Sequence, residues 1–322
     1  MKTEVQEQIK KEFDERATDS AFECSFYTRD LAPVPDFLVD PLFKTRPDMV
    51  VRPQNTAEVA QILKIADENR IPVTPRAGGS TVYFNSIPTR GGILMDLNLI
   101  KGIKALNKDE MTVTVRAATT WSELEEYLNR QGLAAKSYPS SAPVATIGGW
   151  FSMMGYGVGS LKYGNLLSQL RSIKVVFPAG EIKIITSESS PSLDWFACAE
   201  GTLGIITELE LEVRPFTPMC HYLLQVHETN SIASIITTLK DAAVKPYNLH
   251  FSDKYYNQAM RKLGFTAGQI EDANIIAVDY EGEESELKQA AEIVAAVVAG
   301  NKSVRMLNQN IALKEWEERF KA

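Results

Sequence analysis

The stretch from Ile71 to Leu97, IPVTPRAGGSTVYFNSIPTRGGILMDL, determines how the rest of the chain is interpreted. It predicts an apolar strand at 71–74, a break at Pro75, a turn over residues 76–81 and a second strand at 92–97. Adjacent glycines allow a left-handed backbone whose successive N–H groups line one concavity. With an arginine beside it, such a turn suits a phosphate group, but a tight strand connection that binds nothing explains this stretch equally well.

Two further glycine-rich segments lie downstream, each between predicted α/β elements. One runs from Thr146-Ile147-Gly148-Gly149 to Leu161-Lys162-Tyr163-Gly164, and the other is Glu200-Gly201-Thr202-Leu203-Gly204-Ile205-Ile206-Thr207. The run from Gly155 to Gly159 is not a Rossmann fingerprint, because its third glycine is wrongly spaced and no strand leads directly into it. Three separate glycine turns favour one long ligand held along its length. A dinucleotide is the natural candidate, since backbone N–H groups can bind its phosphates.

Composition excludes several classes of protein without selecting a function. The 322 residues are 44% hydrophobic and 23% charged, which is ordinary for a globular chain long enough for two domains. The net charge of −7 argues against nucleic acid as a partner. Cys24, Cys198 and Cys220 match neither a disulfide framework nor an iron–sulfur or zinc spacing, and no metal site is expected. A cytoplasmic location follows from the cysteines, and no apolar run reaches the ~18 residues of a membrane span.

The periodicity of the chain predicts two α/β units followed by a smaller domain. Asn55 with Glu58 and Thr120 with Glu123 are capping-box signatures, and each opens a predicted helix that follows a strand. A hairpin is expected at 172–177 and 182–186, and residues 22–43 are expected to be irregular because of their prolines. Beyond Pro215, strands are predicted at 222–226, 248–251 and 273–279, and helices at 232–243, 254–263 and 284–298.

These segments resemble the FAD-binding oxidases of the vanillyl-alcohol-oxidase type, in the branch of the glycolate oxidase D-subunit and D-lactate dehydrogenase. Pro75-Arg76-Ala77-Gly78-Gly79-Ser80 resembles the family's pyrophosphate loop, and residues 146–164 follow its second flavin loop without a gap. Residues 200–207 are similar to the family's segment near the adenine and ribityl chain. The chain departs from the family at Phe84 and Asn85, and at Trp150-Phe151-Ser152-Met153-Met154, where bulkier residues should reshape the flavin's surroundings.

The resemblance implies an α+β fold class, with a PCMH-type FAD-binding domain of two α/β subdomains followed by a partial ferredoxin-like α+β cap domain. The expected organisation is an N-terminal helix and wrapping segment at 1–46, the FAD-binding domain at 47–217, the cap or substrate domain at 218–306, and the start of an incomplete C-terminal segment at 307–322.

The resemblance also implies FAD as the cofactor, in a groove lined by the three glycine turns. Ser80 stands where related covalent flavoproteins carry the histidine that bonds the flavin, so non-covalent FAD is expected. The candidate cofactor-binding residues are Pro75, Arg76, Ala77, Gly78, Gly79, Ser80, Thr81, Pro139, Thr146, Gly148, Gly149, Ser152, Gly157, Tyr163, Glu200, Gly201, Gly204, Ile205 and Ile206.

The function implied is FAD-dependent oxidation of a small 2-hydroxy acid of the D-lactate or glycolate class, by hydride transfer to flavin N5. The electrons would pass to a partner, for which this branch suggests an iron–sulfur subunit, and peripheral association with the inner face of a membrane is compatible with the sequence. The family's catalytic histidine lies in a C-terminal segment beyond the region of Trp316 and Arg319, where this sequence stops. The alternative is therefore a FAD-binding subunit or fragment, inactive without a separate polypeptide that supplies that segment.

No catalytic residue is assigned from the sequence. The three histidines, His221, His227 and His250, all fall in the expected cap domain. A histidine on a strand most often has only a structural role, and His250, close to Asp253, is the most suggestive of the three.

Overall fold

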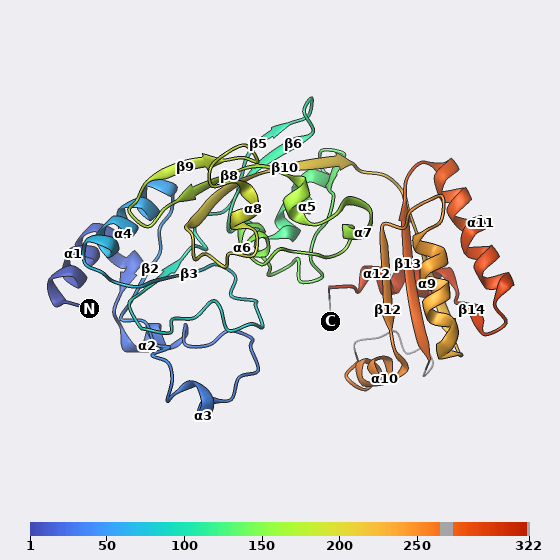
Figure 1. Cartoon of the computed structure of the whole chain (residues 1–322), viewed down its shortest axis with the longest axis horizontal. Helices are drawn as coiled ribbons and strands as arrows, with labels where there is room; N and C mark the ends of the chain where they lie inside the picture. Colours follow the sequence, from blue (N-terminus) through green and yellow to red (C-terminus); the bar gives the residue numbers. More distant parts are fainter. Residues whose placement is uncertain (265–272, 321–322) are drawn as a thin grey trace. The chain divides into compact units, whose positions relative to one another are not determined.

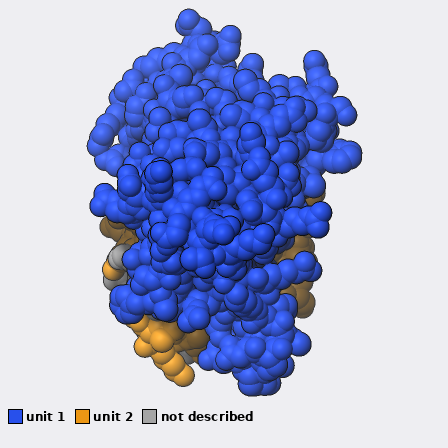
Figure 2. Space-filling model, turned by 90° about the vertical axis from the view of Figure 1, so that its left-hand side faces the viewer, with its two compact units in different colours: residues 1–135, 141–155, 166–214 blue, residues 136–140, 156–165, 215–322 orange. Residues whose placement is uncertain are grey.

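The structure, a computed structural model, describes residues 1–264 and 273–320 and divides into two compact units. Unit 1 comprises residues 1–135, 141–155 and 166–214, and unit 2 comprises residues 136–140, 156–165 and 215–322. Figure 1 traces the elements, and Figure 2 colours unit 1 blue and unit 2 orange. The second glycine-rich segment is therefore divided between the two units.

Unit 1 contains two sheets and the helices that cover them. Its helices are α1 (Thr3–Phe13), α2 (Ala21–Ser25), α3 (Asp36–Val39), α4 (Thr56–Glu68), α5 (Trp121–Asn129), α6 (Ile147–Ser152) and α8 (Leu193–Phe196). Its strands are β1 (Ala17–Thr18), β2 (Met49–Val51), β3 (Val73–Arg76), β4 (Ile93–Asp96), β5 (Ile103–Asn107), β6 (Thr112–Arg116), β7 (Leu133–Ala135), β8 (Leu170–Val176), β9 (Ile182–Ile185) and β10 (Ile205–Pro215).

The first sheet has the order β1-β2-β4-β3, and β4 pairs in parallel with both β2 and β3. Strands β2 and β4 are buried along their whole length, as expected of parallel strands covered on both faces. The predicted break at Pro75 is wrong, because β3 continues through Arg76. β3 is an edge strand, where a proline that cannot donate a ladder hydrogen bond is tolerated.

The second sheet has the order β5-β6-β10-β8-β9, with antiparallel neighbours, and β7 also pairs with β10. Strands β8 and β9 form the hairpin that the sequence predicts. On β10, the carboxylate of Glu208 lies 2.8 Å from Nζ of Lys104 and 2.7 Å from Nζ of Lys174, and its side chain is 15% exposed. Burial alone would raise the pKa of Glu208, but the two ammonium groups outweigh burial and the pKa is lowered.

Replacing Glu208 with glutamine should lower the free energy of unfolding by about 2 kcal/mol at neutral pH, the range for hydrogen bonds to charged groups. Because the folded pKa is lowered, this stabilisation is fully present above the unfolded pKa of about 4.3 and is lost as pH falls through the folded pKa. Urea unfolding at a series of pH values should show the difference from wild type shrinking toward acid. Glu126→Gln is the control, since Glu126 is exposed. A difference that is constant with pH would contradict the prediction.

Unit 2 contains one antiparallel sheet, of order β12-β13-β11-β14. Its strands are β11 (Met219–Val226), β12 (Asn248–Ser252), β13 (Asn274–Glu281) and β14 (Val304–Met306). Its helices are α7 (Ser160–Tyr163), α9 (Ile232–Lys240), α10 (Lys254–Lys262), α11 (Glu284–Gly300) and α12 (Gln309–Glu317). None of the helices in the part of the chain that the structure describes has the length and apolar content that crossing a bilayer requires.

The two faces of the unit 2 sheet differ, because side chains alternate along each strand. One face packs against α9 and α11 in an apolar cluster built around Leu224, Ile276 and Val278 (Figure 1). The opposite face carries a much smaller apolar cluster, in which Leu223 and Ile275 meet Ala312 of α12. The expected α+β class is confirmed, with parallel and antiparallel sheets in unit 1 and an antiparallel sheet backed by helices in unit 2.

Of the other predictions made from the sequence, some are confirmed, one is wrong and some stay predictions. Residues 22–43 are not wholly irregular, since they contain most of α2 and all of α3. α2 precedes the first of the prolines, and the five residues between Pro35 and Pro41 suffice for the single helical turn of α3. Both capping signatures are found at helix starts, and Thr120 with Glu123 forms the complete reciprocal box. The predicted domain boundaries remain predictions, and residues 321–322 of the expected C-terminal segment lie outside the described residues.

Candidate functional site

The turn after β3 offers a row of backbone donors. The N–H groups of residues 77–81 donate no hydrogen bond to any described residue. None of these five residues is buried, so their N–H groups are open to water or to a ligand with acceptor oxygens. Their donor chemistry fits the oxygens of a pyrophosphate, and this is the feature expected of the first glycine turn.

The three glycine turns of unit 1 pack directly on one another. A Cβ at Gly78 would lie 2.4 Å from the carbonyl oxygen of Val144, just before α6, and a Cβ at Gly201 would lie 2.7 Å from Cγ of Pro75. Only glycine permits these two approaches, and Gly201 also has a left-handed φ of +78°. The N–H of Glu200 donates to the carbonyl of Ser152 at 3.0 Å, which joins the third turn to the second.

Strained backbone concentrates around these turns. Of the seven non-glycine residues with left-handed φ in the described chain, four are Phe84 (60°), Met154 (54°), Cys198 (60°) and Glu200 (51°). Such conformations cost about 1–3 kcal/mol each and persist where the surrounding structure enforces them, often at ligand sites. The side chain of Asn85 donates to Glu200 Oε2 at 2.9 Å, which links the strained segments to each other.

Arg76 is engaged within unit 1. Its Nη1 donates to the carbonyl of Arg29 at 2.8 Å, and its guanidinium lies 5.6 Å from the ring centroid of Tyr27. Burial lowers the pKa of Arg76, although the charge of Asp30 opposes that effect. Arg76 therefore ties the first turn to the N-terminal segment, and its contact with the cofactor stays a prediction.

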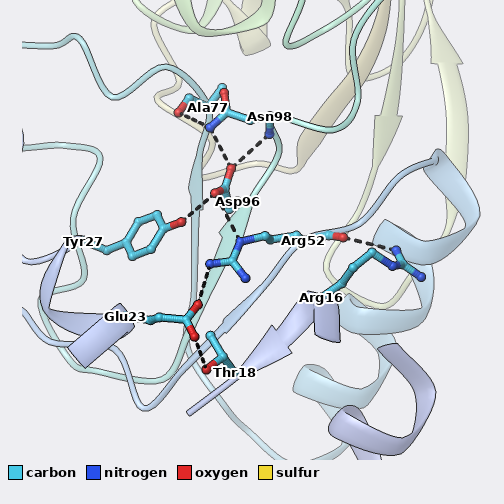
Figure 3. A network of polar contacts seen from close by, with 8 residues as sticks. All are labelled: Arg16, Thr18, Glu23, Tyr27, Arg52, Ala77, Asp96 and Asn98. Atoms are coloured by element: carbon cyan, nitrogen blue, oxygen red, sulfur yellow. Dashed lines mark hydrogen bonds and ion pairs between the residues drawn. The ribbon is translucent and has the colours of Figure 1, made fainter. Parts of the chain in front are cut away.

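A buried polar network around Asp96 contacts the start of the first turn (Figure 3). Asp96, 7% exposed, accepts from the hydroxyl of Tyr27 at 2.7 Å, and from the amide N–H and side-chain Nδ2 of Asn98 at 3.0 and 2.7 Å. The same Nδ2 donates to the carbonyl of Ala77 at 3.1 Å. Arg52, bound to Glu23 at 3.1 Å, lies 3.9 Å from Asp96. The network fixes the backbone at the start of the turn.

The remaining candidates in unit 1 are placed mainly by backbone contacts. Thr146 caps α6 by accepting from the N–H of Gly149 at 3.3 Å. Ser152 Oγ donates to the carbonyl of Gly148 at 2.9 Å. The structure brings together in unit 1 the candidates Pro75, Arg76, Ala77, Gly78, Gly79, Ser80, Thr81, Thr146, Gly148, Gly149, Ser152, Glu200, Gly201, Gly204, Ile205 and Ile206. A surface hollow is lined in part by Pro75 of β3 and by Gly201 and Gly204 of the third turn.

Three candidates, Pro139, Gly157 and Tyr163, belong instead to unit 2. Gly157 lies against Pro139, since a Cβ there would be 3.1 Å from Cα of Pro139. The hydroxyl of Tyr163 donates to Glu281 Oε1 on β13 at 2.5 Å, and Lys162 Nζ lies 3.3 Å from the same oxygen. These contacts hold the second half of the second glycine segment on the unit 2 sheet.

Two polar groups of unit 2 were not identified as functional from the sequence. Arg319 lies 4.0 Å from the ring centroid of Trp316 and 4.2 Å from that of Phe320, and it forms no ion pair with a carboxylate among the described residues. His221 on β11 lies with Nδ1 2.8 Å from Asp279 Oδ1 on β13. The only sequence signal for Arg319 was the tryptophan that precedes it. No sequence signal indicated the pairing of His221 with Asp279, because that pairing depends on strand register.

His250 was singled out from the sequence because Asp253 is close to it. In the structure His250 is exposed on β12, and the carboxylate of Asp253 accepts from the N–H of Tyr256 at 2.7 Å. Asp253 is therefore the N-cap of α10.

Sequence comparison identifies the cofactor domain. Residues 47–186 match the family model described as "FAD binding domain". The mitochondrial D-lactate dehydrogenase (cytochrome) of Arabidopsis thaliana is 33% identical over 205 residues, which cover 61% of this chain and 34% of that protein. Glycolate oxidase subunit GlcD of Bacillus subtilis is 29% identical over 221 residues, covering 66% of this chain and 47% of that protein. The chain thus spans about a third to a half of the length of these curated relatives.

Comparison with solved structures supports the same fold. An alkyldihydroxyacetonephosphate synthase matches with a TM-score of 0.86 at 20% identity, over 100% of this chain and 63% of that chain. The p-cresol methylhydroxylase matches with a TM-score of 0.76 at 16% identity, over 99% of this chain and 68% of that chain. The expected PCMH-type fold is confirmed, and FAD is the cofactor. Residues 47–186 therefore match the FAD binding domain family, in a chain that is similar in sequence to D-lactate dehydrogenases and a glycolate oxidase subunit.

Proposed function

We propose that this chain is a FAD-dependent oxidoreductase that oxidises the CH–OH group of a small 2-hydroxy acid of the D-lactate or glycolate class. The relatives named above support the substrate class, and the glycine turns support the cofactor site. When bound, FAD supplies the two-electron acceptor that such an oxidation requires. The chain's own residues must hold the cofactor, bind a carboxylate and receive a proton.

The observation that carries the substrate class at the level of residues is Arg319. A guanidinium enclosed by aromatic rings, with no carboxylate partner in the described chain, is suited to bind the carboxylate of a small acid in two parallel hydrogen bonds. The aromatic rings of Trp316 and Phe320 fix its plane by cation–π contact. Arg319 also donates through Nε to the hydroxyl of Tyr138 at 3.3 Å, so its orientation is set from two sides.

The cofactor is proposed to be held without a covalent bond. The N–H groups of residues 77–81 would bind the pyrophosphate, and the close-packed turns at Gly78 and Gly201 would let the backbone approach it. Ser80 offers a hydroxyl where a covalent flavoprotein needs an imidazole. Denaturing the holoprotein should therefore release all of its FAD into solution.

The electrons are proposed to leave through a partner protein, with an iron–sulfur subunit as the candidate. The support is the printed name of one relative, which describes a glycolate oxidase subunit. A cytoplasmic location is also proposed, on the basis of the cysteines. Peripheral association with a membrane is proposed as well, because the sequence is compatible with it. Copurification of the chain with an iron-containing protein would test this partner.

The deciding experiment is an anaerobic visible spectrum of the FAD-loaded chain before and after addition of D-lactate or glycolate. Bleaching of the flavin bands is the expected result. Arg319→Met should keep FAD but need at least tenfold more substrate for the same bleaching, whereas Lys314→Met, exposed on the helix that precedes Arg319, should behave like wild type. Bands that persist with a panel of 2-hydroxy acids would overturn the proposed oxidation. They would leave the alternative of a FAD-binding subunit whose catalytic histidine is on another polypeptide.

A further inference from the structure

A hollow of about 440 Å³ lies in unit 1 where the parallel strands of the first sheet begin. The residues that directly precede β2, β3 and β4 all line it, namely Asp48, Pro72 and Gly92. The first glycine turn follows the other end of β3. The hollow is therefore at the end of the sheet opposite the turn that is proposed to bind the pyrophosphate of FAD, and its volume is in the range of small-molecule sites.

Three cations reach this hollow from separate parts of the chain. Lys2 directly precedes α1, Arg70 follows the C-cap of α4, and Arg90 lies shortly before β4. All three are exposed, and none of them forms an ion pair or a side-chain hydrogen bond with another residue that the structure describes. In a chain with a net charge of −7, they leave a local excess of positive charge that a bound anion would neutralise.

The carboxylate at the hollow, Asp48, does not balance these cations. Its Oδ1 lies 2.7 Å from Nζ of Lys44, and its Oδ2 accepts from the N–H of Gly92 at 2.9 Å and lies 3.6 Å from the amino group of Met1. Burial alone would raise the pKa of Asp48, but the hydrogen bonds from Lys44 and Gly92 outweigh burial and the pKa is lowered. Asp48 is thus ionised at neutral pH, and its charge is already neutralised by other groups.

The backbone fixes two of the three cations at the hollow. The segment of Arg90 is tied to Lys44, whose N–H donates to the carbonyl of Thr89 at 3.1 Å and whose carbonyl accepts from the N–H of Gly91 at 2.9 Å. Arg70 has a φ of +53° at the position after the C-cap of α4, where glycine is the usual residue. A positive charge there also suits the helix dipole, but the dipole does not explain the cations contributed by the other two segments.

We propose that this hollow binds a small molecule that carries a phosphate group, and that Arg70 and Arg90 bind the phosphate. Guanidinium groups match phosphate oxygens in paired, charge-assisted hydrogen bonds. A phosphate monoester carries about two negative charges near neutral pH, which the unpaired cations can balance. Ile71 and Pro72 offer apolar surface to the organic part of the ligand. A soluble metabolite and a lipid headgroup both present this chemistry, and the site does not depend on the proposed oxidation.

The binding test titrates the FAD-loaded full chain with inorganic pyrophosphate at low salt, followed by isothermal titration calorimetry. Saturable binding of one pyrophosphate per chain is expected, and it should weaken as NaCl is added, because exposed charges are screened. FAD occupies its own site in this experiment, so the ³¹P signals of its phosphates should not change. Displacement of FAD, or the absence of saturable binding at low salt, would overturn the proposal.

Variants assign the binding to the hollow. Arg70→Gln and Arg90→Gln should each raise the dissociation constant for pyrophosphate by about 10- to 100-fold, the size expected for hydrogen bonds to a charged group. Arg46→Gln is the matched control, because Arg46 is exposed in the same unit but does not line the hollow. An equal loss in Arg46→Gln would mean that only net charge matters, and that result or unchanged binding in the Arg70→Gln, Arg90→Gln double variant would overturn the proposal.

A further variant separates the loss of the guanidinium from damage to the end of α4. Arg70→Gly keeps the left-handed backbone without strain, so it should fold like wild type and still lose binding as Arg70→Gln does. Circular dichroism and FAD titration check the fold of every variant. Wild-type affinity for pyrophosphate in Arg70→Gly would show that the side chain of Arg70 takes no part in binding.

Vesicle flotation identifies the source of the phosphate. Vesicles of phosphatidylcholine with phosphatidic acid should carry the wild-type chain, and pyrophosphate should release it, if the ligand is a lipid headgroup. Vesicles of phosphatidylcholine alone are the control. A chain that binds pyrophosphate but neither kind of vesicle has a site for a soluble phosphorylated molecule.

Discussion

Gly78→Val should raise the dissociation constant for FAD by up to about 100-fold. A Cβ at this position would lie 2.4 Å from the carbonyl oxygen of Val144, closer than real Cβ contacts occur, and a backbone oxygen cannot rotate away. The turn over residues 77–81 must therefore move away from the segment that leads into α6. Overpacking of this kind costs about 1–3 kcal/mol, and at the upper end of that range the loss is about 100-fold in affinity.

FAD titration followed by flavin fluorescence measures this effect directly. Gly300→Val is the matched control, because the space around its Cβ is open and the residue ends α11 far from the turns in sequence. Circular dichroism distinguishes a displaced turn from an unfolded chain. The first sheet should remain intact, since its core contains neither Gly78 nor Val144. A Gly78→Val variant that binds FAD like wild type would show that the first turn is only a strand connection.

The glycine turns were the most predictable part of the site, because glycine identity itself encodes backbone requirements. Gly78 and Gly201 stand where a side chain would collide with Val144 and Pro75, and the sequence shows both as glycines in turns between predicted elements. Local signals of the same kind placed the Thr120 cap and the hairpin of β8 and β9. Local sequence failed at Pro75, because whether a strand lies at the edge of a sheet depends on pairing partners distant in the chain.

The polar contacts of the site could not be predicted for the same reason. His221 and Asp279 are 58 residues apart, and Tyr163 and Glu281 are 118 apart. Each pair exists only because particular strands or loops lie side by side in one register, and a shift by one residue would turn the side chain to the other face. His250 drew attention because an aspartate is near it in sequence, yet that aspartate caps a helix. Proximity in sequence and proximity across a sheet are independent.

Asp96→Ala should lower the free energy of unfolding by about 3–5 kcal/mol and weaken FAD binding as well. Removing one partner of a buried charged network leaves the others without compensation, which is costlier than the network's net contribution. The hydroxyl of Tyr27 and the side chain of Asn98 would each lose their carboxylate partner, and the guanidinium of Arg52 would lose a nearby charge (Figure 3). Asn98 would then hold the carbonyl of Ala77 less firmly, which couples the network to the first turn.

Tyr27→Phe is the graded control, because it removes one hydrogen bond and leaves the carboxylate with Asn98 and Arg52. It should cost about 1 kcal/mol and leave FAD affinity nearly unchanged. Burial raises the pKa of Tyr27, and its hydrogen bond to Asp96 raises it further, so the hydroxyl remains a donor throughout the neutral range. Urea unfolding and FAD titration of both variants and their double mutant measure the coupling between the two residues. If Asp96→Ala cost no more than Tyr27→Phe, the carboxylate would be solvated in the folded chain, and the first turn would owe its shape to the glycines alone.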